Sequence, residues 1–271
     1  MFQTVFKRYE KKYIIDGGQY EEVENYLTYN AVPDEYGKSR VCSLYYDTPD
    51  NRLIRASLDK PIYKEKLRLR SYGAPTGDGL VFIEIKKKFK GIVYKRRLAL
   101  TLPAALAFVS GLPYEQACAR WPLSDAALAA AALSPATRQI ARELEVAMDR
   151  WLPLVPSMGI ACDRVAWAYR PEMFQEREGD ELFDSELRIT FDDCLEYLDC
   201  HCFHSPWRPI IESSESVMEI KSAGPYPPWL VEVLSAERIY PASFTKYGNA
   251  YQMATAEPRA RNHRRAMRSG A

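Results

Sequence analysis

The chain alternates hydrophobic and polar residues over several short stretches, the pattern of β-strands with one buried face. These stretches are rich in Tyr, Val, Ile and Phe and are bounded by turn residues. They comprise residues 4–15, 41–47, 62–72, 80–89, 92–100, 160–169, 187–191 and 216–221. Lys90 and Gly91 leave so short a connection between two of them that a hairpin is expected. The pattern predicts an antiparallel sheet, sandwich or barrel, with little βαβ alternation.

Helical periodicity is confined to a few segments. They comprise residues 19–28, a long block at 103–151 and residues 229–236. The clearest helix runs over 135–150, where Ser134 is expected to be the N-cap and Pro135 the first helical residue. Its apolar residues recur at helical spacing, which predicts one buried face.

Composition narrows the functional classes. The 271 residues are 47% hydrophobic and 27% charged, as in ordinary soluble proteins. Lys and Arg number 37 against 36 Asp and Glu, which argues against a basic protein that coats nucleic acid. The sequence has neither an apolar stretch of about 18–20 residues nor a signal peptide, and its six cysteines indicate reduced thiols. A cytoplasmic protein without a membrane segment of its own is expected.

The charged faces of the predicted strands are strongly cationic, although the chain as a whole is nearly neutral. For one strand, a solvated face is the ordinary explanation. Six strands with the same bias need a further reason, because gathered like charges repel one another. If the sheet closes, these faces would line a channel that binds a polyanion. Arg guanidinium groups would bind it through paired hydrogen bonds, and Lys ammonium groups through their charge. Glu10, Glu84 and Glu219 on the same faces could hold Mg²⁺ or Mn²⁺.

Six motifs in a fixed order carry a family resemblance. They are Phe6–Tyr13, Ser43–Thr48, Lys66–Arg70, Glu84–Lys86, Met218–Lys221 and Ser243–Tyr247. On these motifs the chain resembles, over roughly residues 4–251, the VTC domain of the triphosphate tunnel metalloenzyme superfamily, which is related to CYTH proteins. The resemblance implies a mainly β (α+β) fold, a closed eight-stranded antiparallel tunnel with helices packed outside. The expected domain covers residues 1–255, with a mainly helical insertion at 103–152, and a basic tail, expected to be disordered, covers 256–271.

The resemblance also assigns roles to individual residues. Phosphate ligands at the catalytic centre would be Lys12, Arg68, Arg70, Lys86, Arg164, Arg188 and Lys246. Further substrate-binding residues would be Arg8, Lys66, Lys88, Lys95, Arg97, Lys221, Ser243 and Tyr247. Glu219 would be the main ligand of Mn²⁺ or Mg²⁺, with Glu10 and Glu84 beside it. The first strand has Arg8 where the wider superfamily has an acid, which favours the VTC type over the hydrolases.

The implied activity is metal-dependent transfer of the ATP γ-phosphate to a polyphosphate chain. ATP, triphosphate and polyphosphate are therefore the expected partners, and a membrane partner that accepts the product stays compatible with the sequence. An inorganic or nucleoside triphosphatase and a non-catalytic polyphosphate-binding module remain alternatives. Nucleic acid is not expected, because Lys87 faces away from Lys86 and Lys88 and stacking aromatics are not interleaved. The segment Cys200–His204 lacks zinc-ligand spacing, and Cys202 and His204 are interpreted as packing residues in a strand or loop.

Overall fold

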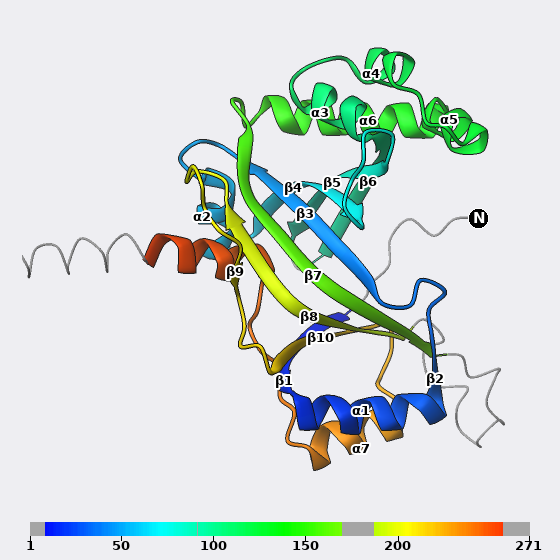
Figure 1. The fold of residues 1–271 in the computed structure, drawn as a ribbon, viewed down its shortest axis with the longest axis vertical. Helices are drawn as coiled ribbons and strands as arrows, with labels where there is room; N and C mark the ends of the chain where they lie inside the picture. The colour runs from blue at the N-terminus through cyan, green and yellow to red at the C-terminus, as the bar shows by residue number, and fades with distance from the viewer. Residues whose placement is uncertain (1–8, 91, 170–186, 257–271) are drawn as a thin grey trace, which may run out of the picture. The chain divides into compact units, whose positions relative to one another are not determined.

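The computed structural model describes residues 9–90, 92–169 and 187–256, which form an α+β fold (Figure 1). The strands are β1 (Tyr9–Asp16), β2 (Ala31–Pro33), β3 (Ser39–Asp47), β4 (Tyr63–Tyr72), β5 (Leu80–Phe89), β6 (Ile92–Thr101), β7 (Val155–Tyr169), β8 (Arg188–Asp199), β9 (Arg208–Pro209) and β10 (Glu215–Ser222). The helices are α1 (Gly17–Asn30), α2 (Arg52–Leu58), α3 (Leu102–Val109), α4 (Tyr114–Arg120), α5 (Ala126–Ala132), α6 (Pro135–Asp149), α7 (Pro228–Ala236) and one over residues 246–256.

The strands form one hydrogen-bonded sheet in the order β1-β10-β8-β7-β3-β4-β5-β6, with β2 paired to β7 and β9 to β8. Every pairing whose register is resolved is antiparallel, as the sequence predicts. β1 and β6 stand at the two ends of this order, so the sheet is not closed within the described residues. The expectation of a closed tunnel is therefore not confirmed. Closure needs a hydrogen-bonded register between the two end strands, and side-chain alternation carries no information about it.

The chain divides into two compact units, which we describe separately. Unit 1 comprises Met1–Arg40, Cys162–Glu196 and Pro209–Thr245, and unit 2 comprises Val41–Ala161, Tyr197–Arg208 and Lys246–Ala271. β7 and β8 each contribute residues to both units. In the described part of the chain, none of the helices is long and apolar enough to span a membrane.

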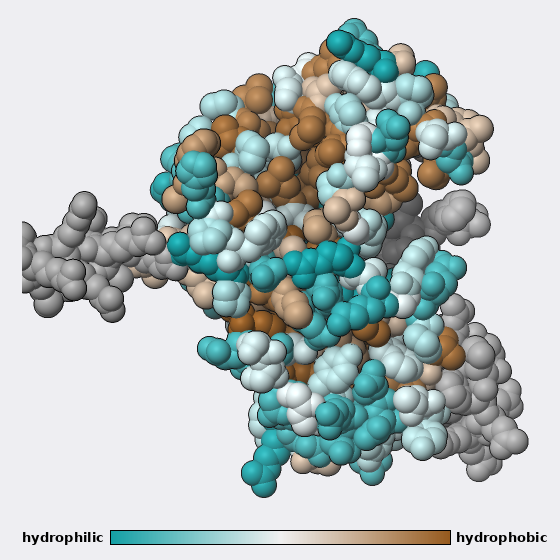
Figure 2. Space-filling view, in the orientation of Figure 1, coloured by the Kyte–Doolittle hydropathy of each residue, from teal (hydrophilic) through white to brown (hydrophobic). Residues whose placement is uncertain are grey.

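The core of unit 2 lies between the apolar faces of β4–β6 and the helices α3, α4 and α6. α6 forms as the sequence predicts: Ser134 Oγ accepts a hydrogen bond from the backbone N–H of Thr137, and Pro135 is the first helical residue. Its buried side, which includes Leu144 and Met148, packs into this core. Hydrophobic residues also reach the surface over α3–α6 and the adjoining strands, in the upper part of Figure 2.

The core of unit 1 forms where β1, β8 and β10 turn their apolar side chains towards α1 and α7. Tyr13, Phe191, Met218 and Ile220 are almost fully buried there. α1 begins with a capping box, in which Asp16 accepts from the Gln19 backbone and the Gln19 side chain accepts from the Asp16 backbone. Burial of one side of these strands places their alternate, charged residues together on the other side.

Most predicted strands and long helices agree with the structure to within a few residues, the first strand over its described part. Two strands are longer than predicted: β7 begins at Val155 rather than at residue 160, and β8 continues to Asp199 rather than ending at residue 191. α2, β2, β9 and the helix over 246–256 were not predicted. The helical block expected at 103–151 consists of α3, α4, α5 and α6. Of the predicted basic tail, 256–271, all but Ala256 lies outside the described residues, as does Arg8.

Candidate functional site

Unit 2 contains a continuous row of cations on one side of β4, β5 and β6. Direct partners in an antiparallel sheet share a face, and the register sets Lys66 opposite Lys86 and Lys86 opposite Lys95. Arg68, Glu84 and Arg97 form the next row. We call the cationic side chains of this side the cationic face: Lys64, Lys66, Arg68, Arg70, Lys86, Lys88, Lys95 and Arg97. The opposite sides of the same strands carry the buried apolar residues of the unit 2 core.

The cationic face places like charges directly across the strands. Lys64 lies opposite Lys88, in addition to the row formed by Lys66, Lys86 and Lys95. Such cross-strand pairs are destabilising in the absence of a counter-charge. Burial lowers the pKa of the Lys64 ammonium, and Lys88, Lys60 and Lys86 lower it further. The arrangement therefore favours an anion with several negative charges.

Glu84 provides the counter-charge within this face. Its side chain is 1% exposed and lies 2.7 Å from the Arg68 guanidinium, 2.7 Å from Lys95 Nζ and 2.5 Å from Arg97 Nε. Burial acts to raise the pKa of the Glu84 carboxyl, but Arg68, Lys95 and Arg70 outweigh it and hold that pKa well below its usual range. Glu84 is thus a fixed anion that orients two guanidinium groups.

Tyr45 on β3 adds a titratable group beside the cationic face. Arg68 Nη1 donates a hydrogen bond of 3.1 Å to the Tyr45 hydroxyl, and the Tyr45 ring stacks on Tyr247 with centroids 4.5 Å apart. Burial acts to raise the pKa of the Tyr45 phenol, but Arg68, Lys66 and Arg70 outweigh it and lower that pKa to about 8. Tyr45 is not among the site residues predicted from the sequence. Its position two residues before Asp47 on an alternating strand was the available signal.

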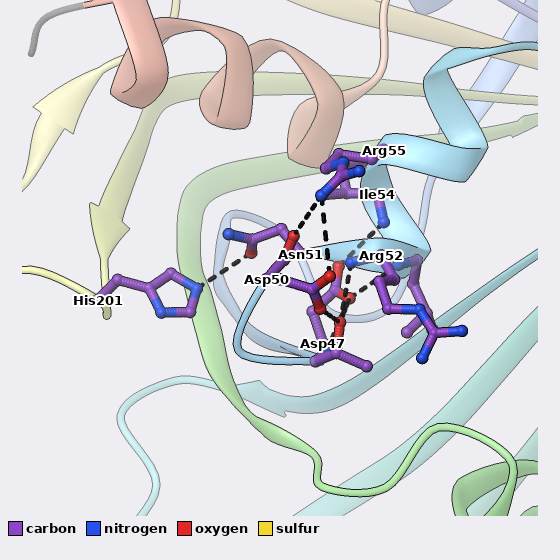
Figure 3. A network of polar contacts seen from close by, with 9 residues as sticks. Asp47, Asp50, Asn51, Arg52, Ile54, Arg55 and His201 are labelled. Atoms are coloured by element: carbon purple, nitrogen blue, oxygen red, sulfur yellow. Dashed lines mark hydrogen bonds and ion pairs between the residues drawn. The ribbon is translucent and has the colours of Figure 1, made fainter.

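Tyr247, predicted to bind substrate, is held in a buried polar network. Its hydroxyl donates to Asp47 Oδ2 at 2.8 Å and lies 2.9 Å from Ser157 Oγ. Asp47 also accepts from the backbone N–H groups of Leu53 and Ile54 and so caps α2 (Figure 3). The network fixes the Tyr247 ring against Tyr45, which in turn contacts Arg68.

Unit 1 carries a second group of charged residues on β1 and β10. Lys12 lies opposite Glu219, with Nζ 3.0 Å from the carboxylate and 3.4 Å from that of Glu10. Lys221 Nζ is 2.5 Å from Glu219. Burial acts to raise the pKa of the Glu219 carboxyl, but Lys12 and Lys221 outweigh it and keep that pKa well below its usual range. Glu219 is therefore an anion at neutral pH.

Two predicted phosphate ligands of unit 1 form ion pairs with carboxylates. Arg164 makes a two-pronged contact with Asp192, with Nε 2.7 Å from Oδ1 and Nη2 2.8 Å from Oδ2. Burial acts to lower the pKa of Arg164, and Asp192 outweighs it and raises that pKa. Arg188 Nη2 lies 2.8 Å from Asp34 Oδ2, with its side chain 49% exposed. Asp192 was not selected from the sequence, although it alternates with Arg188 and Thr190 on β8.

Oxygen atoms suited to a divalent cation gather around Glu219. Glu10 and Glu219 both contact Lys12, and Thr190, the cross-strand neighbour of Glu219, has a buried hydroxyl without a hydrogen bond within the described residues. Hard cations such as Mg²⁺ take one or two carboxylates together with phosphate oxygens. These donors fit that mode, although no cluster of three or more His, Cys, Asp or Glu side chains exists in the described part of the chain. Glu84, the third predicted metal ligand, belongs to unit 2.

The remaining predicted residues lie near the C-terminal helix. Ser243 is exposed, and Lys246 is half-buried at the first residue of the helix over 246–256. Of the full set, β4–β6 bring together Lys66, Arg68, Arg70, Lys86, Lys88, Lys95, Arg97 and Glu84, and β1 and β10 bring together Glu10, Lys12, Glu219 and Lys221.

Comparisons with known proteins place the chain in a family. The family model described as the VTC domain matches residues 7–255. A search of curated proteins gave no match. One similar solved structure is a candidate adenylate cyclase from Bacillus halodurans, with a TM-score of 0.45 and 12% identity over 90% of this chain and 96% of that one. Another is a candidate adenylate cyclase from Vibrio parahaemolyticus, with a TM-score of 0.42 and 9% identity over 91% of this chain and 98% of that one. A third is a candidate adenylyl cyclase from Hippeastrum, described as revealing a dominant triphosphatase activity, with a TM-score of 0.45 and 14% identity over 90% of this chain and 94% of that one. Because these scores are low, the conclusion rests on the domain model: the chain belongs to the VTC domain family.

Proposed function

We propose that this protein is a metal-dependent phosphotransferase that moves the γ-phosphate of ATP onto a polyphosphate chain. The observation that carries the proposal is the cationic face, where Lys66, Lys86 and Lys95 stand side by side in one row. A row of neighbouring ammonium groups matches a linear anion with a charge on every phosphoryl unit.

In this proposal the side chains of the cationic face bind and orient the phosphates. Lys66, Lys86 and Lys95 would contact non-bridging oxygens as point charges, and Arg68 and Arg97 would offer planar forks. Glu84 keeps these two guanidinium groups in place before substrate arrives, since it contacts both. Phosphoryl transfer depends mainly on positioning and electrostatic stabilisation, which such a preorganised set supplies.

The carboxylates of unit 1 would hold Mn²⁺ or Mg²⁺. When bound, the cation would neutralise charge on phosphate oxygens. Lys12 and Lys221 keep Glu219 ionised, as cation binding requires, and the orphan hydroxyl of Thr190 adds an oxygen donor. Glu10 would complete the protein's contribution through its carboxylate.

The transfer itself needs no covalent enzyme intermediate. An oxygen of the terminal phosphate of the polyphosphate chain attacks the γ-phosphorus of ATP, the bond to the bridging oxygen breaks, and ADP leaves with that electron pair. The chain becomes one phosphate longer. If water took the acceptor's place, the same groups would release free phosphate, so the acceptor decides between polymerase and triphosphatase.

The test is an incubation with ATP, Mn²⁺ and a short polyphosphate primer, followed by gel staining for long chains and an assay for free phosphate. We expect chain growth with little phosphate release. Lys86→Ala should reduce turnover about tenfold or more, because one charge-assisted contact contributes about 1.5–3 kcal/mol. Lys87→Ala is the matched control, since Lys87 is the next residue of β5 and lies on the other side of the sheet.

Each outcome has one interpretation. Free phosphate without chain growth would replace the polymerase by a triphosphatase. Binding of tripolyphosphate without turnover in the presence of either cation would indicate a binding module. Equal loss in Lys86→Ala and Lys87→Ala would remove the cationic face from the site.

A further inference from the structure

The end of the sheet formed by β4, β5 and β6 exposes an unusual number of apolar side chains. Phe89 pairs with Tyr63 on one side and with Ile92 on the other, and the backbone N–H of Lys90 donates to the carbonyl of Ile62 at 3.0 Å. We call the exposed apolar side chains at this end, on both sides of the sheet, the hairpin tip: Ile62, Tyr63, Phe89, Ile92, Val93 and Tyr94. All of them belong to unit 2.

The exposure of the hairpin tip is large for apolar residues. Ile62 is 68% exposed, Phe89 44%, and Ile92 and Val93 42% each. Single exposed apolar residues are common, but a contiguous group surrounded by polar residues marks an interaction surface. Tyr63 and Phe89 pack edge to face, so the tip is a formed cluster, and the Glu65 carboxylate accepts from the Tyr63 hydroxyl.

Lysines surround the hairpin tip. They are Lys60, Lys64, Lys87, Lys88 and Lys90. Lys90 Nζ lies 5.5 Å from the centre of the Phe89 ring, and Lys64 is close enough to Lys60 and Lys88 for both to lower its pKa. The carboxylates nearest in sequence are the exposed Asp59 and Glu65, which is buried and contacts Arg150 and the Trp151 indole. The rim is therefore predominantly positive.

We infer that the hairpin tip docks onto the surface of an anionic lipid bilayer. Apolar and aromatic side chains flanked by Lys are suited to insertion at the boundary between headgroups and acyl chains. Tyr94 combines a ring with a polar end, as residues at that boundary do. A second copy of the chain fits less well, because a two-fold contact through this tip would bring two lysine rims together.

The apolar side chains of the tip lie outside the groups assigned to phosphate or metal, whereas Lys64 and Lys88 of the rim also belong to the cationic face. Substitutions in the apolar side chains therefore test the inference separately from the proposed function. It is tested by sedimentation of the full chain with vesicles of phosphatidylcholine alone and of phosphatidylcholine mixed equally with phosphatidylglycerol. We expect binding to the anionic vesicles and at least about tenfold weaker binding to the neutral ones. The double variant Phe89→Ser, Ile92→Ser should lower the partition coefficient about tenfold or more. Lys90→Glu should lower it about fivefold.

The matched control is Leu106→Ser with Val146→Ser. Both residues are exposed apolar side chains of unit 2, at 44% and 62%, and lie on α3 and α6. This control should bind vesicles as the wild type does, and thermal unfolding should show that each variant is folded. Vesicle binding is also measured with saturating tripolyphosphate, which distinguishes lipid headgroups from soluble phosphate anions as the ligand. Binding that depends on the apolar side chains of the tip should persist under this condition.

Four results would overturn the inference. They are absence of binding to anionic vesicles, unchanged binding by the Phe89→Ser, Ile92→Ser variant, complete displacement by tripolyphosphate, and a concentration-dependent dimer that this variant abolishes. The last would identify a second copy as the occupant of the tip.

Discussion

Replacing Glu84 with glutamine tests whether the like charges of the cationic face destabilise the fold unless an anion balances them. The substitution keeps the shape of the side chain and removes the counter-charge that contacts Arg68, Lys95 and Arg97. Removal of one partner from a buried ion pair costs about 3–5 kcal/mol. Because Lys95 is 44% and Arg97 33% exposed, water can solvate both after the change, and we expect the lower end, about 3 kcal/mol. The melting temperature should fall by roughly 6–12 °C.

The measurement is urea unfolding of both proteins with and without tripolyphosphate. The variant's face carries one more positive charge, so it should bind tripolyphosphate more tightly than the wild type. A ligand that binds only the folded state stabilises it by RT ln(1 + [L]/Kd), so tighter binding by the variant should narrow the gap in the free energy of unfolding as tripolyphosphate is added. Glu143→Gln is the control. Its partner Arg96, 2.8 Å away, also lies on β6, but both side chains are about one-third exposed, and the loss should stay below about 1 kcal/mol.

The pH dependence gives an independent check. The folded-state pKa of Glu84 is depressed, so its contribution is complete above the ordinary carboxyl pKa and is lost as pH falls towards the folded-state pKa. Wild type and Glu84→Gln should therefore approach one another below about pH 4. Equal stability of the two proteins at pH 7, or a gap that widens with tripolyphosphate, would contradict this prediction.

Three further predictions concern the surroundings of the site. The phenol of Tyr45 has a pKa of about 8 in the folded state and about 10 in the unfolded state, so its ionisation should add about 2–3 kcal/mol to the free energy of unfolding as pH rises from 8 to 10. Tyr45→Phe should remove this increase. Urea unfolding as a function of pH measures it, and parallel pH profiles of wild type and variant would contradict the prediction. Asp192→Asn should cost at least about 3 kcal/mol, because it leaves the guanidinium of Arg164 buried without its counter-charge, and Arg164→Gln in the same chain should recover part of the loss in a double-mutant cycle. Glu65→Gln, which weakens contacts to Arg150 and Trp151 on the helix side of β4, should lower the free energy of unfolding by about 1–3 kcal/mol and leave turnover of the folded protein unchanged; a selective loss of turnover would contradict this.

The strands and the long helices were predictable because burial of one side imposes a strict period. Leu67 and Leu69 alternate with Arg68 and Arg70, so the cationic side of β4 followed from alternation alone. α2 was not predictable in the same way. It begins after Asn51 in the left-handed conformation (φ 59°), and its capping oxygens come from Asp47 at the end of β3. A seven-residue helix stabilised from another element has no signal of its own.

The sequence predicts on which side of its strand each residue of the candidate site lies, but not which side chain it contacts. Alternation assigns Glu84 and Arg68 to the charged sides of their strands, whereas their contact depends on register, which two separate strand sequences do not specify. The same holds for Arg164, which the resemblance assigns to phosphate and the structure pairs with Asp192. Tyr45 was overlooked for a related reason, because its low pKa arises from cations on the neighbouring strand.

The two units balance their charges in different ways, and this difference suggests separate tasks. In unit 1 the basic groups meet carboxylates, with Lys12 and Lys221 at Glu219 and Arg164 at Asp192. In unit 2 Glu84 alone contacts three cations of the cationic face, Arg68, Lys95 and Arg97. An added anion should stabilise most where like charges stand side by side, as in the row formed by Lys66, Lys86 and Lys95. Added tripolyphosphate should therefore protect the amides of β4–β6 from hydrogen exchange more than those of β1 and β10. Divalent cations should instead protect the amides of β1 and β10 more than those of β4–β6. The reason is that Glu219 and the neighbouring Thr190 hydroxyl, which has no hydrogen bond within the described residues, lie in unit 1.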